Sequence, residues 1–263
     1  MPCLSVLRPE QALDIEFDEI IISNVRPNEI IAIDRQLKDL GIANSKIQAL
    51  SYKKDLYMKF LLTGEDDECI NQRVVWLKNW ADYVHLKHLP GNVAECGVNK
   101  GRFARFINKY FKDRKFYMFD SFEGFRKSDI DTNLGLKDES FNTSVYNKVG
   151  FFSDTNIEIV MSKMLYPEKC EVHKGYIPES AAGLKDEFCF VNLDMDLYQP
   201  MLEGLKIFYP MMVKGGVILM HNYFHEDLAT SVQKALEDYE TFIGHELCKI
   251  PIGDFISIAV IKN

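Results

Sequence analysis

The chain has 263 residues, of which 47% are hydrophobic and 27% charged, and its formal net charge at pH 7 is −8. These values are typical of a globular protein with one large domain and an appendage, and the acidic balance argues against a nucleic-acid partner. No run of about 20 apolar residues predicts a membrane span. The six cysteines form no C-x-x-C pair and no signal-peptide pattern opens the sequence, so we expect reduced thiols and a cytoplasmic protein.

Residues 1–50 predict a small β-α-β appendage. Residues 17–22 (FDEIII) predict a strand, a helix begins at Pro27 and closes near Gly41, and residues 47–50 predict a second short strand. One such unit cannot bury both faces of its strands. It also lacks a glycine-rich loop, so we interpret it as a packing or dimerisation arm and expect a homo-oligomer.

Residues 51–90 predict a helical linker or cap that ends at the Pro90-Gly91 turn. Its apolar residues recur at helical spacing: Val74, Leu77, Ala81 and Val84.

From residue 91 to 263 strand and helix patterns alternate. The predicted strands are residues 92–98, 115–120, 171–175, 188–194 and 215–223, and the predicted helices are residues 103–111, 201–212 and 228–242. Alternation of this kind predicts a parallel α/β sheet with helices on both faces.

The last two predicted strands, residues 246–250 and 255–261, are separated by only four residues. A parallel crossover needs a dozen residues or more, so only an antiparallel hairpin fits. A mostly parallel Rossmann-like sheet that closes with such a hairpin is the pattern of the class I methyltransferase fold. The polar segment 121–160, between the second and third strands, is either a lid or a surface loop.

The segment ECGVNKG, residues 95–101, lies between a predicted strand and a predicted helix. Glycines let the backbone approach a ligand closely, and a helix N-terminus presents free N–H groups. Asp120 ends the next strand, 19 residues after Gly101. A carboxylate at this spacing can accept hydrogen bonds from ribose hydroxyls. A tight turn and a strand-end cap are the alternatives, but together the two features favour a nucleotide-like cofactor.

Asp194 ends the fourth predicted strand, and His221 and Asn222 end the fifth. Because ligands of open α/β sheets bind at the carboxyl ends of the strands, we expect these side chains in one crevice. They could hold a divalent cation that activates a bound hydroxyl, or His221 could act as a general base. A hydrogen-bonded polar cluster that closes the sheet is the alternative.

Five stretches together resemble the macrocin O-methyltransferase (TylF/MycF-like) family, whose members methylate sugar hydroxyls in antibiotic and cell-surface glycans. They are VAECGVNKGRFA, FDSFEGF, VHKGYIPES, FVNLDMDLYQPMLEGLKIFYP and GGVILMHNY, in the family's order over residues 92–225. Residues 1–90 lie outside these stretches. The resemblance implies an S-adenosylmethionine-dependent O-methyltransferase that acts on a small-molecule, sugar-nucleotide or glycan acceptor.

The resemblance also implies site residues and a magnesium or manganese ion. The predicted cofactor-binding residues are Glu95, Cys96, Gly97, Val98, Gly101, Asp120, Ser121, Phe122, Gly175, Tyr176 and Asp194. The predicted catalytic residues are Asp194 and His221, and the predicted metal ligands are Asp194, His221 and Asn222. The family often has Asp where this chain has Asn222, and Asn brings no charge, so we expect weaker metal binding.

Two other functions compete with this interpretation. The chain could be a partner subunit that binds the cofactor but has lost catalytic power, because its HNY triplet is altered. It could also be an NAD-dependent sugar enzyme, although the terminal hairpin and the absence of a G-x-G-x-x-G run count against this.

Overall fold

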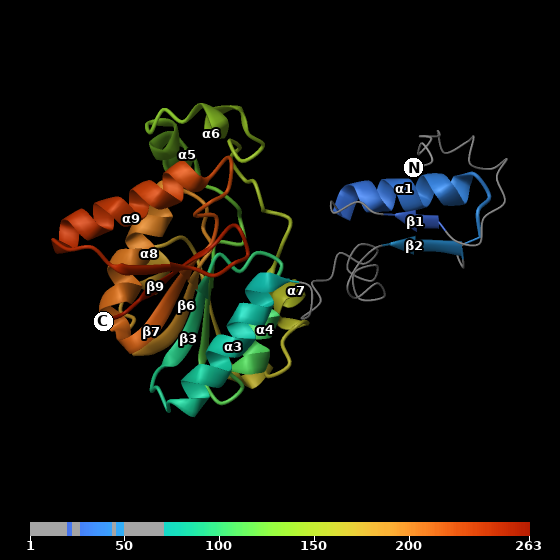
Figure 1. Cartoon of the computed structure of the whole chain (residues 1–263). Coiled ribbons are helices and arrows are strands. Elements are labelled where there is room, and N and C mark those ends of the chain that lie inside the picture. Colours follow the sequence, from blue (N-terminus) through green and yellow to red (C-terminus); the bar gives the residue numbers. More distant parts are fainter. Residues whose placement is uncertain (1–19, 23–26, 44–45, 50–70) are drawn as a thin grey trace, which may run out of the picture. The chain divides into compact units, whose positions relative to one another are not determined.

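The computed structural model describes residues 20–22, 27–43, 46–49 and 71–263. Contacts divide the chain into two units, residues 1–71 and 72–263. The first unit contains β1 (Ile20–Ile22), α1 (Pro27–Asp39) and β2 (Ile47–Ala49), and the two strands pair in parallel (Figure 1). This is the predicted β-α-β arrangement, although residues 17–19 and 50–70 of the predicted elements lie outside the described residues.

The second unit is built on one seven-stranded sheet of order β5-β4-β3-β6-β7-β9-β8. Figure 1 labels β3, β6, β7 and β9 of this sheet. Its strands are β3 (Asn92–Cys96), β4 (Phe116–Asp120), β5 (Cys170–Lys174), β6 (Phe188–Leu193), β7 (Met212–Met220), β8 (Cys248–Pro251) and β9 (Ile258–Ile261). The first five pair in parallel, and β9 runs antiparallel to both β7 and β8. The predicted fold class, a mostly parallel sheet with a C-terminal antiparallel hairpin, is confirmed.

Helices connect these strands. They are α3 (Gln72–Leu86), α4 (Ala104–Tyr110), α5 (Lys127–Leu134), α6 (Glu139–Thr143), α7 (Ile157–Met161), α8 (Tyr198–Met211) and α9 (Ala229–Ile243), with two short 3-10 helices at Pro167–Lys169 and Glu179–Ala181. By its contacts α3 belongs to the second unit, and it packs in the same core cluster as α4. We had predicted it as part of a separate linker or cap.

Alternation along the strands sends side chains to two different cores. In β4, Tyr117 and Phe119 lie in the cluster formed with α8 and α9, whereas Phe116 and Met118 lie in the cluster formed with α3 and α4. Successive side chains of a strand point to opposite faces of a sheet. The strands are therefore apolar on both faces, as in a parallel sheet covered by two helical layers.

The chain order of the sheet reverses at β3, which has β4 on one side and β6 on the other. The chain leaves β3 toward one side of the sheet and leaves β6 toward the other. In sheets of this kind a crevice opens between the two connections, at the carboxyl ends of the strands. The predicted site residues lie at the ends of β3, β4, β5, β6 and β7 and in the loops that follow them.

Candidate active site

The loop after β3 packs tightly against the end of β6. Gly97 has φ of +87°, and a Cβ there would lie 1.9 Å from the backbone oxygen of Asp194. The N–H of Asp194 donates to the carbonyl oxygen of Cys96 at 2.8 Å. The side chains of Cys96 and Val98 are buried in the two cores, so of these two predicted cofactor residues only the backbone can face a ligand.

Asp120 sits at the end of β4 with both carboxylate oxygens in use. Oδ2 accepts a hydrogen bond from the N–H of Asn99 and Oδ1 from the N–H of Phe122, each at 2.7 Å. Burial raises the pKa of this carboxyl, and these backbone donors oppose the increase. A carboxylate has about four acceptor sites, so the half-buried Asp120 retains capacity for a ligand's hydroxyls.

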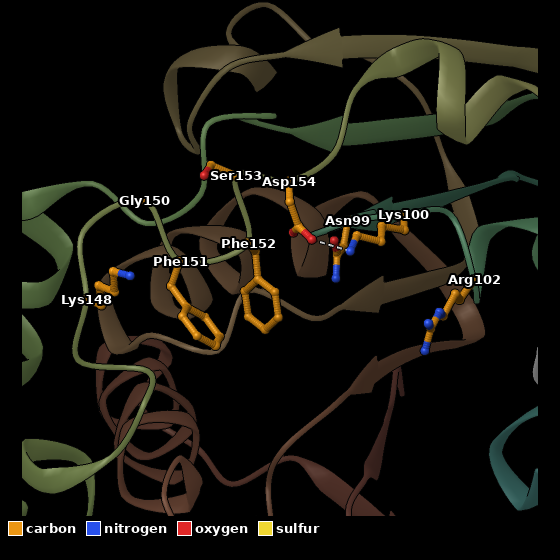
Figure 2. Close-up of a pocket in the computed structure, with 9 residues that line it drawn as sticks. All are labelled: Asn99, Lys100, Arg102, Lys148, Gly150, Phe151, Phe152, Ser153 and Asp154. Atoms are coloured by element: carbon orange, nitrogen blue, oxygen red, sulfur yellow. Dashed lines mark hydrogen bonds and ion pairs between the residues drawn. The ribbon is translucent and has the colours of Figure 1, made fainter. Parts of the chain in front are cut away.

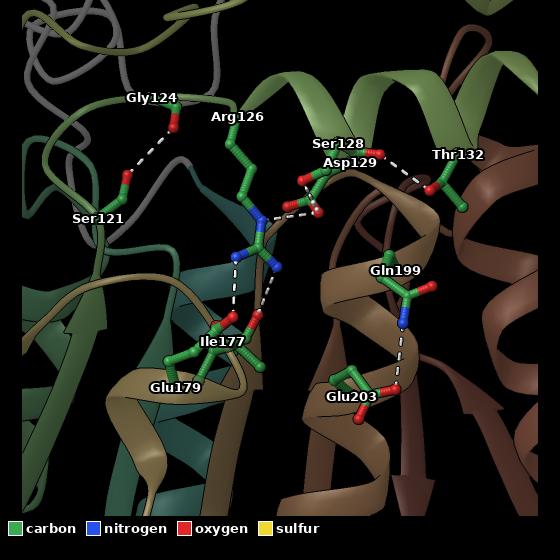
Figure 3. Close-up of polar contacts among 10 residues, drawn as sticks. All are labelled: Ser121, Gly124, Arg126, Ser128, Asp129, Thr132, Ile177, Glu179, Gln199 and Glu203. Carbon is green, nitrogen blue, oxygen red and sulfur yellow. Dashed lines mark hydrogen bonds and ion pairs between the residues drawn. The ribbon is translucent and has the colours of Figure 1, made fainter.

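Arg126 fastens the loop after β4 to the loop after β5. Its Nε lies 2.9 Å from Oδ1 of Asp129, and Nη2 donates to the carbonyl oxygen of Ile177 at 3.3 Å (Figure 3). The guanidinium also lies over the ring of Tyr176, 4.9 Å from its centroid.

Two further hydrogen bonds stabilise the same edge of the crevice, where β4 and β5 end. The N–H of Gly175 donates to the carbonyl oxygen of Asp120 at 2.9 Å, and the hydroxyl of Ser121 donates to the carbonyl oxygen of Gly124 at 3.1 Å (Figure 3). The predicted residues Asp120, Ser121, Phe122, Gly175 and Tyr176 thus belong to one rim, which Arg126 holds in place.

Glu95 is buried at the end of β3 with only 1% of its surface exposed. Its Oε1 accepts a hydrogen bond from the amide of Asn192 at 2.9 Å, but its Oε2 has no hydrogen-bond partner among the described residues. Burial raises the pKa of Glu95 well above its usual range, and the charge of Arg73 offsets only part of the effect. A buried acceptor without a partner is costly, and a cationic amino group of a ligand would satisfy it.

Asp194 lies between two basic side chains. Its Oδ2 accepts a hydrogen bond from Nη2 of Arg73 at 3.0 Å, and its Oδ1 lies 3.0 Å from Nδ1 of His221. The second contact has the distance of an ion pair but not the alignment of a hydrogen bond. Burial opposes ionisation of Asp194, but the charges of His221 and Arg73 outweigh it and hold the pKa of this carboxyl below its usual range.

Asp196 and Asn222 form a second buried pair beside Asp194. The amide of Asn222 donates to Oδ1 of Asp196. Both residues adopt the left-handed region, with φ of +64° and +61°. Strained backbone of this kind persists where surrounding contacts hold it, often at functional sites.

The three predicted metal ligands all contact other side chains. Each oxygen of Asp194 already faces a nitrogen of Arg73 or His221, and the amide of Asn222 is turned toward Asp196. Within residues 71–263 and the shorter described ranges, no group of three His, Cys, Asp or Glu side chains could hold a metal ion. The structure therefore gives no support to the predicted Mg²⁺ or Mn²⁺ site, and the positive charge beside Asp194 in this arrangement is a guanidinium.

Segment 121–160 contains α5, α6 and most of α7. An aromatic cluster organises it: Tyr146 meets the ring of His225 edge-on at 5.6 Å, and Phe151 and Phe152 pack at 4.5 Å. His225 follows β7, so the segment contacts the loop that carries His221.

A cavity of about 530 Å³ opens between this segment and the loop after β3 (Figure 2). Its lining residues are Asn99, Lys100, Arg102, Lys148, Gly150, Phe151, Phe152, Ser153 and Asp154. Lys100 pairs with Asp154, whereas none of the ion pairs in the described part of the chain involves Arg102 or Lys148. The cavity is therefore lined by the rings of Phe151 and Phe152 and by two basic side chains, Arg102 and Lys148, for which no ion pair is found among the described residues.

Sequence reasoning had missed Arg73, Asn192 and Asp196 as parts of the site. A signal for Arg73 existed, because it precedes Leu77 by four residues and thus lies on the apolar stripe of a helix, where an arginine is unusual. Two further polar side chains lie at the end of β5 and after β7: Lys174 pairs with Glu123 at 3.3 Å, and Nδ1 of His225 accepts the N–H of Asp227 at 3.1 Å.

Several solved structures are similar to this chain. The O-methyltransferase NovP matches with a TM-score of 0.59 and 18% identity, covering 73% of this chain and 80% of NovP. The calicheamicin methyltransferase CalS11 matches with a TM-score of 0.59 and 15% identity over 91% of this chain and 94% of CalS11. Its apo structure, described as a TDP-rhamnose 3'-O-methyltransferase, matches with a TM-score of 0.51 and 14% identity over 91% of this chain and 96% of that one. At these identities the likeness establishes the fold, and no curated protein sequence matches significantly.

A family model identifies the chain more directly. The model of macrocin O-methyltransferase (TylF) matches residues 69–251. The match begins well before residue 92, where our resemblance started, and so includes α3 and Arg73. Because it spans more than half of the chain, the chain belongs to the macrocin O-methyltransferase (TylF) family.

Proposed function

We propose that this chain transfers the methyl group of S-adenosylmethionine to a hydroxyl of a sugar, with His221 as the general base and Asp194 as its orienting partner. The observation that carries the proposal is the contact between Asp194 and His221, at the ends of β6 and β7, beside the loop after β3. Membership of an O-methyltransferase family supports the reaction class.

The residues around the crevice fit S-adenosylmethionine. Asp120 would accept hydrogen bonds from the ribose hydroxyls, and the orphan Oε2 of Glu95 would accept one from the α-amino group. Gly97 has no side chain, so the backbone of the loop after β3 could approach the cofactor closely. When bound, the cofactor supplies an electrophilic methyl group on a positively charged sulfur.

The chain's own residues would position the acceptor and remove its proton. Asp194 lies against Nδ1 of His221, and the other ring nitrogen would accept the proton of the acceptor hydroxyl. Alignment of the hydroxyl oxygen with the methyl group supplies the rest of the rate acceleration.

We propose a sugar nucleotide as the acceptor. Arg102 and Lys148 line the cavity beside Asn99, and their positive charges could bind a diphosphate. The rings of Phe151 and Phe152, which line the same cavity, could pack against a base or the face of a sugar. The fold is shared with CalS11, whose described acceptor is a TDP-sugar.

The test is formation of adenosylhomocysteine with a panel of nucleoside diphosphate sugars, free sugars and glycans. His221→Gln should lower kcat by about 10²–10⁴-fold and leave the affinity for adenosylhomocysteine unchanged. His245→Gln is the matched control, because His245 is exposed and lies outside the crevice. If adenosylhomocysteine binds but no acceptor turns over, the alternative of a catalytically weakened partner subunit replaces this proposal.

A further inference from the structure

Arg73 is buried beside the end of β6 and is held by contacts with three side chains. Its Nη2 donates to Oδ1 of Asn192 at 2.7 Å and to Oδ2 of Asp194 at 3.0 Å. Its guanidinium carbon lies 4.0 Å from the centroid of the Phe103 ring, at the start of α4. Only 7% of the residue is exposed, so this arginine is part of the packed interior.

The guanidinium links the cofactor side of the crevice to the catalytic side. Asn192 accepts from Arg73 and donates to Glu95, while Asp194 accepts from Arg73 and meets His221. A continuous polar chain thus runs from β3 through β6 to β7. Buried charges are tolerated when they are paired and hydrogen-bonded, and Arg73 is the group that pairs them here.

A divalent cation on the same carboxylate oxygen would collide with this arrangement. Cations of this kind bind carboxylate oxygens at about 2.0–2.6 Å, which would place a second positive charge against the nitrogen of Arg73 that lies 3.0 Å from Oδ2. Repulsion between the two positive charges should therefore weaken binding of a divalent cation at this oxygen.

We propose that Arg73 is the resident cation of this reaction centre and that methyl transfer here needs no divalent metal. Arg73 is a positioning residue that holds Asp194 so that its other oxygen meets His221. The turnover part of this inference rests on the proposed function, whereas the exclusion of metal from Asp194 does not.

The first experiment measures Mn²⁺ binding by electron paramagnetic resonance and needs no turnover. Wild type should bind no stoichiometric Mn²⁺ up to roughly 1 mM. Arg73→Gln should bind about one Mn²⁺ per chain, and Arg73→Gln with Asp194→Asn should lose it. Lys78→Gln, which removes an exposed positive charge from the same helix, should behave like wild type.

Either of two results would overturn the inference. One is a wild-type Mn²⁺ site that Asp194→Asn abolishes, and the other is an Arg73→Gln variant that is folded by circular dichroism and binds no more Mn²⁺ than wild type. If Arg73→Gln does not fold, the wild-type titration alone decides.

The second experiment measures turnover with whichever acceptor of the panel described above is methylated. Chelator should change the wild-type rate by less than about twofold, and Arg73→Gln should lower kcat by about a hundredfold through misplacement of the catalytic pair. Arg73→Lys keeps the charge and should stay at least about tenfold above Arg73→Gln, still insensitive to chelator. Loss of wild-type activity in chelator, with recovery on Mg²⁺ addition, would overturn the inference. Absence of turnover with every acceptor, together with the expected Mn²⁺ results, would instead overturn the proposed function.

Discussion

Individual side chains in this crevice have environments that differ sharply over a few ångströms. Asp194 and Asp196 are two residues apart, yet the pKa of the first is held low by His221 and Arg73, whereas burial and the charge of Asp194 raise the pKa of the second. Neighbouring titratable groups whose pKa values are shifted in opposite directions are typical of catalytic centres. Each can be tested separately.

Asp120 should control cofactor affinity. Asp120→Ala removes the carboxylate that would bind the ribose, and a charge-assisted hydrogen bond is worth roughly 1.5–3 kcal/mol. We expect affinity for adenosylhomocysteine to fall about ten- to hundredfold by titration calorimetry. Asp131→Ala, at an exposed position on α5, is the control. Unchanged affinity in a folded Asp120→Ala protein would remove Asp120 from the cofactor site.

Asp196 should make the protein less stable as the pH rises. Because its pKa is raised in the folded state, its stabilising contribution is complete below the unfolded pKa of about 3.9 and is lost as the pH increases toward the folded value. Asp196→Asn mimics the neutral form and can still accept from Asn222, so the stability of the variant relative to wild type should increase as the pH rises above about 4. Each pKa unit corresponds to about 1.4 kcal/mol, or roughly 2–4 °C in melting temperature. Parallel melting curves across this pH range would contradict the assignment.

At the scale of elements, the site depends on how closely the loop after β3 meets the end of β6. The sequence motif predicted a glycine loop for ligand approach, but the closest neighbour of Gly97 is the backbone of Asp194. The glycine therefore serves the packing of the sheet end as well as the crevice.

Gly97→Ala should destabilise the protein by about 3 kcal/mol or more, because it adds a clash at 1.9 Å to the strain of a positive φ. Gly183→Ala is the matched control: its φ is +79° and a Cβ would meet nothing within 4 Å, so it should cost only about 1–2 kcal/mol. Urea denaturation of both variants measures the difference. Equal losses would show that the contact with Asp194 is unimportant.

Hydrophobic periodicity predicted the parallel strands of the sheet well, because each is a short apolar run with turn residues on either side. It could not predict segment 121–160, whose folding depends on distant aromatic contacts such as Tyr146 with His225. The sequence could not predict the neighbours of Asp194 for a related reason. Which group neutralises Asp194 depends on α3, and Arg73 lies 121 residues away in sequence.

At the scale of the whole molecule, the chain consists of two units, and the family match at residues 69–251 lies almost entirely in the second. The described residues contain no helix that is both long and apolar enough to cross a membrane. All of the site residues described above belong to the second unit.

Removal of residues 1–70 should therefore leave cofactor binding intact. We expect the shortened protein to bind adenosylhomocysteine within about threefold of the full chain, since a shift of that size is below 1 kcal/mol. We also expect light scattering to report a changed oligomer size or lower solubility, because the β-α-β unit cannot bury its strands alone. A folded, unchanged oligomer that no longer binds the cofactor product would show that the first unit contributes to the cofactor site.

The position of β3 inside the sheet, between β4 and β6, also affects how fast the protein can fold. Asn92 in β3 pairs with Phe188 in β6, 96 residues later, whereas β4 and β5 add only to the opposite side. Until β6 docks, β3 presents an unpaired apolar edge, and such edges recruit other chains. Closing so long a loop delays the gain from its contacts. Refolding should accordingly be limited by the docking of β6 onto β3, and its yield should fall as protein concentration rises.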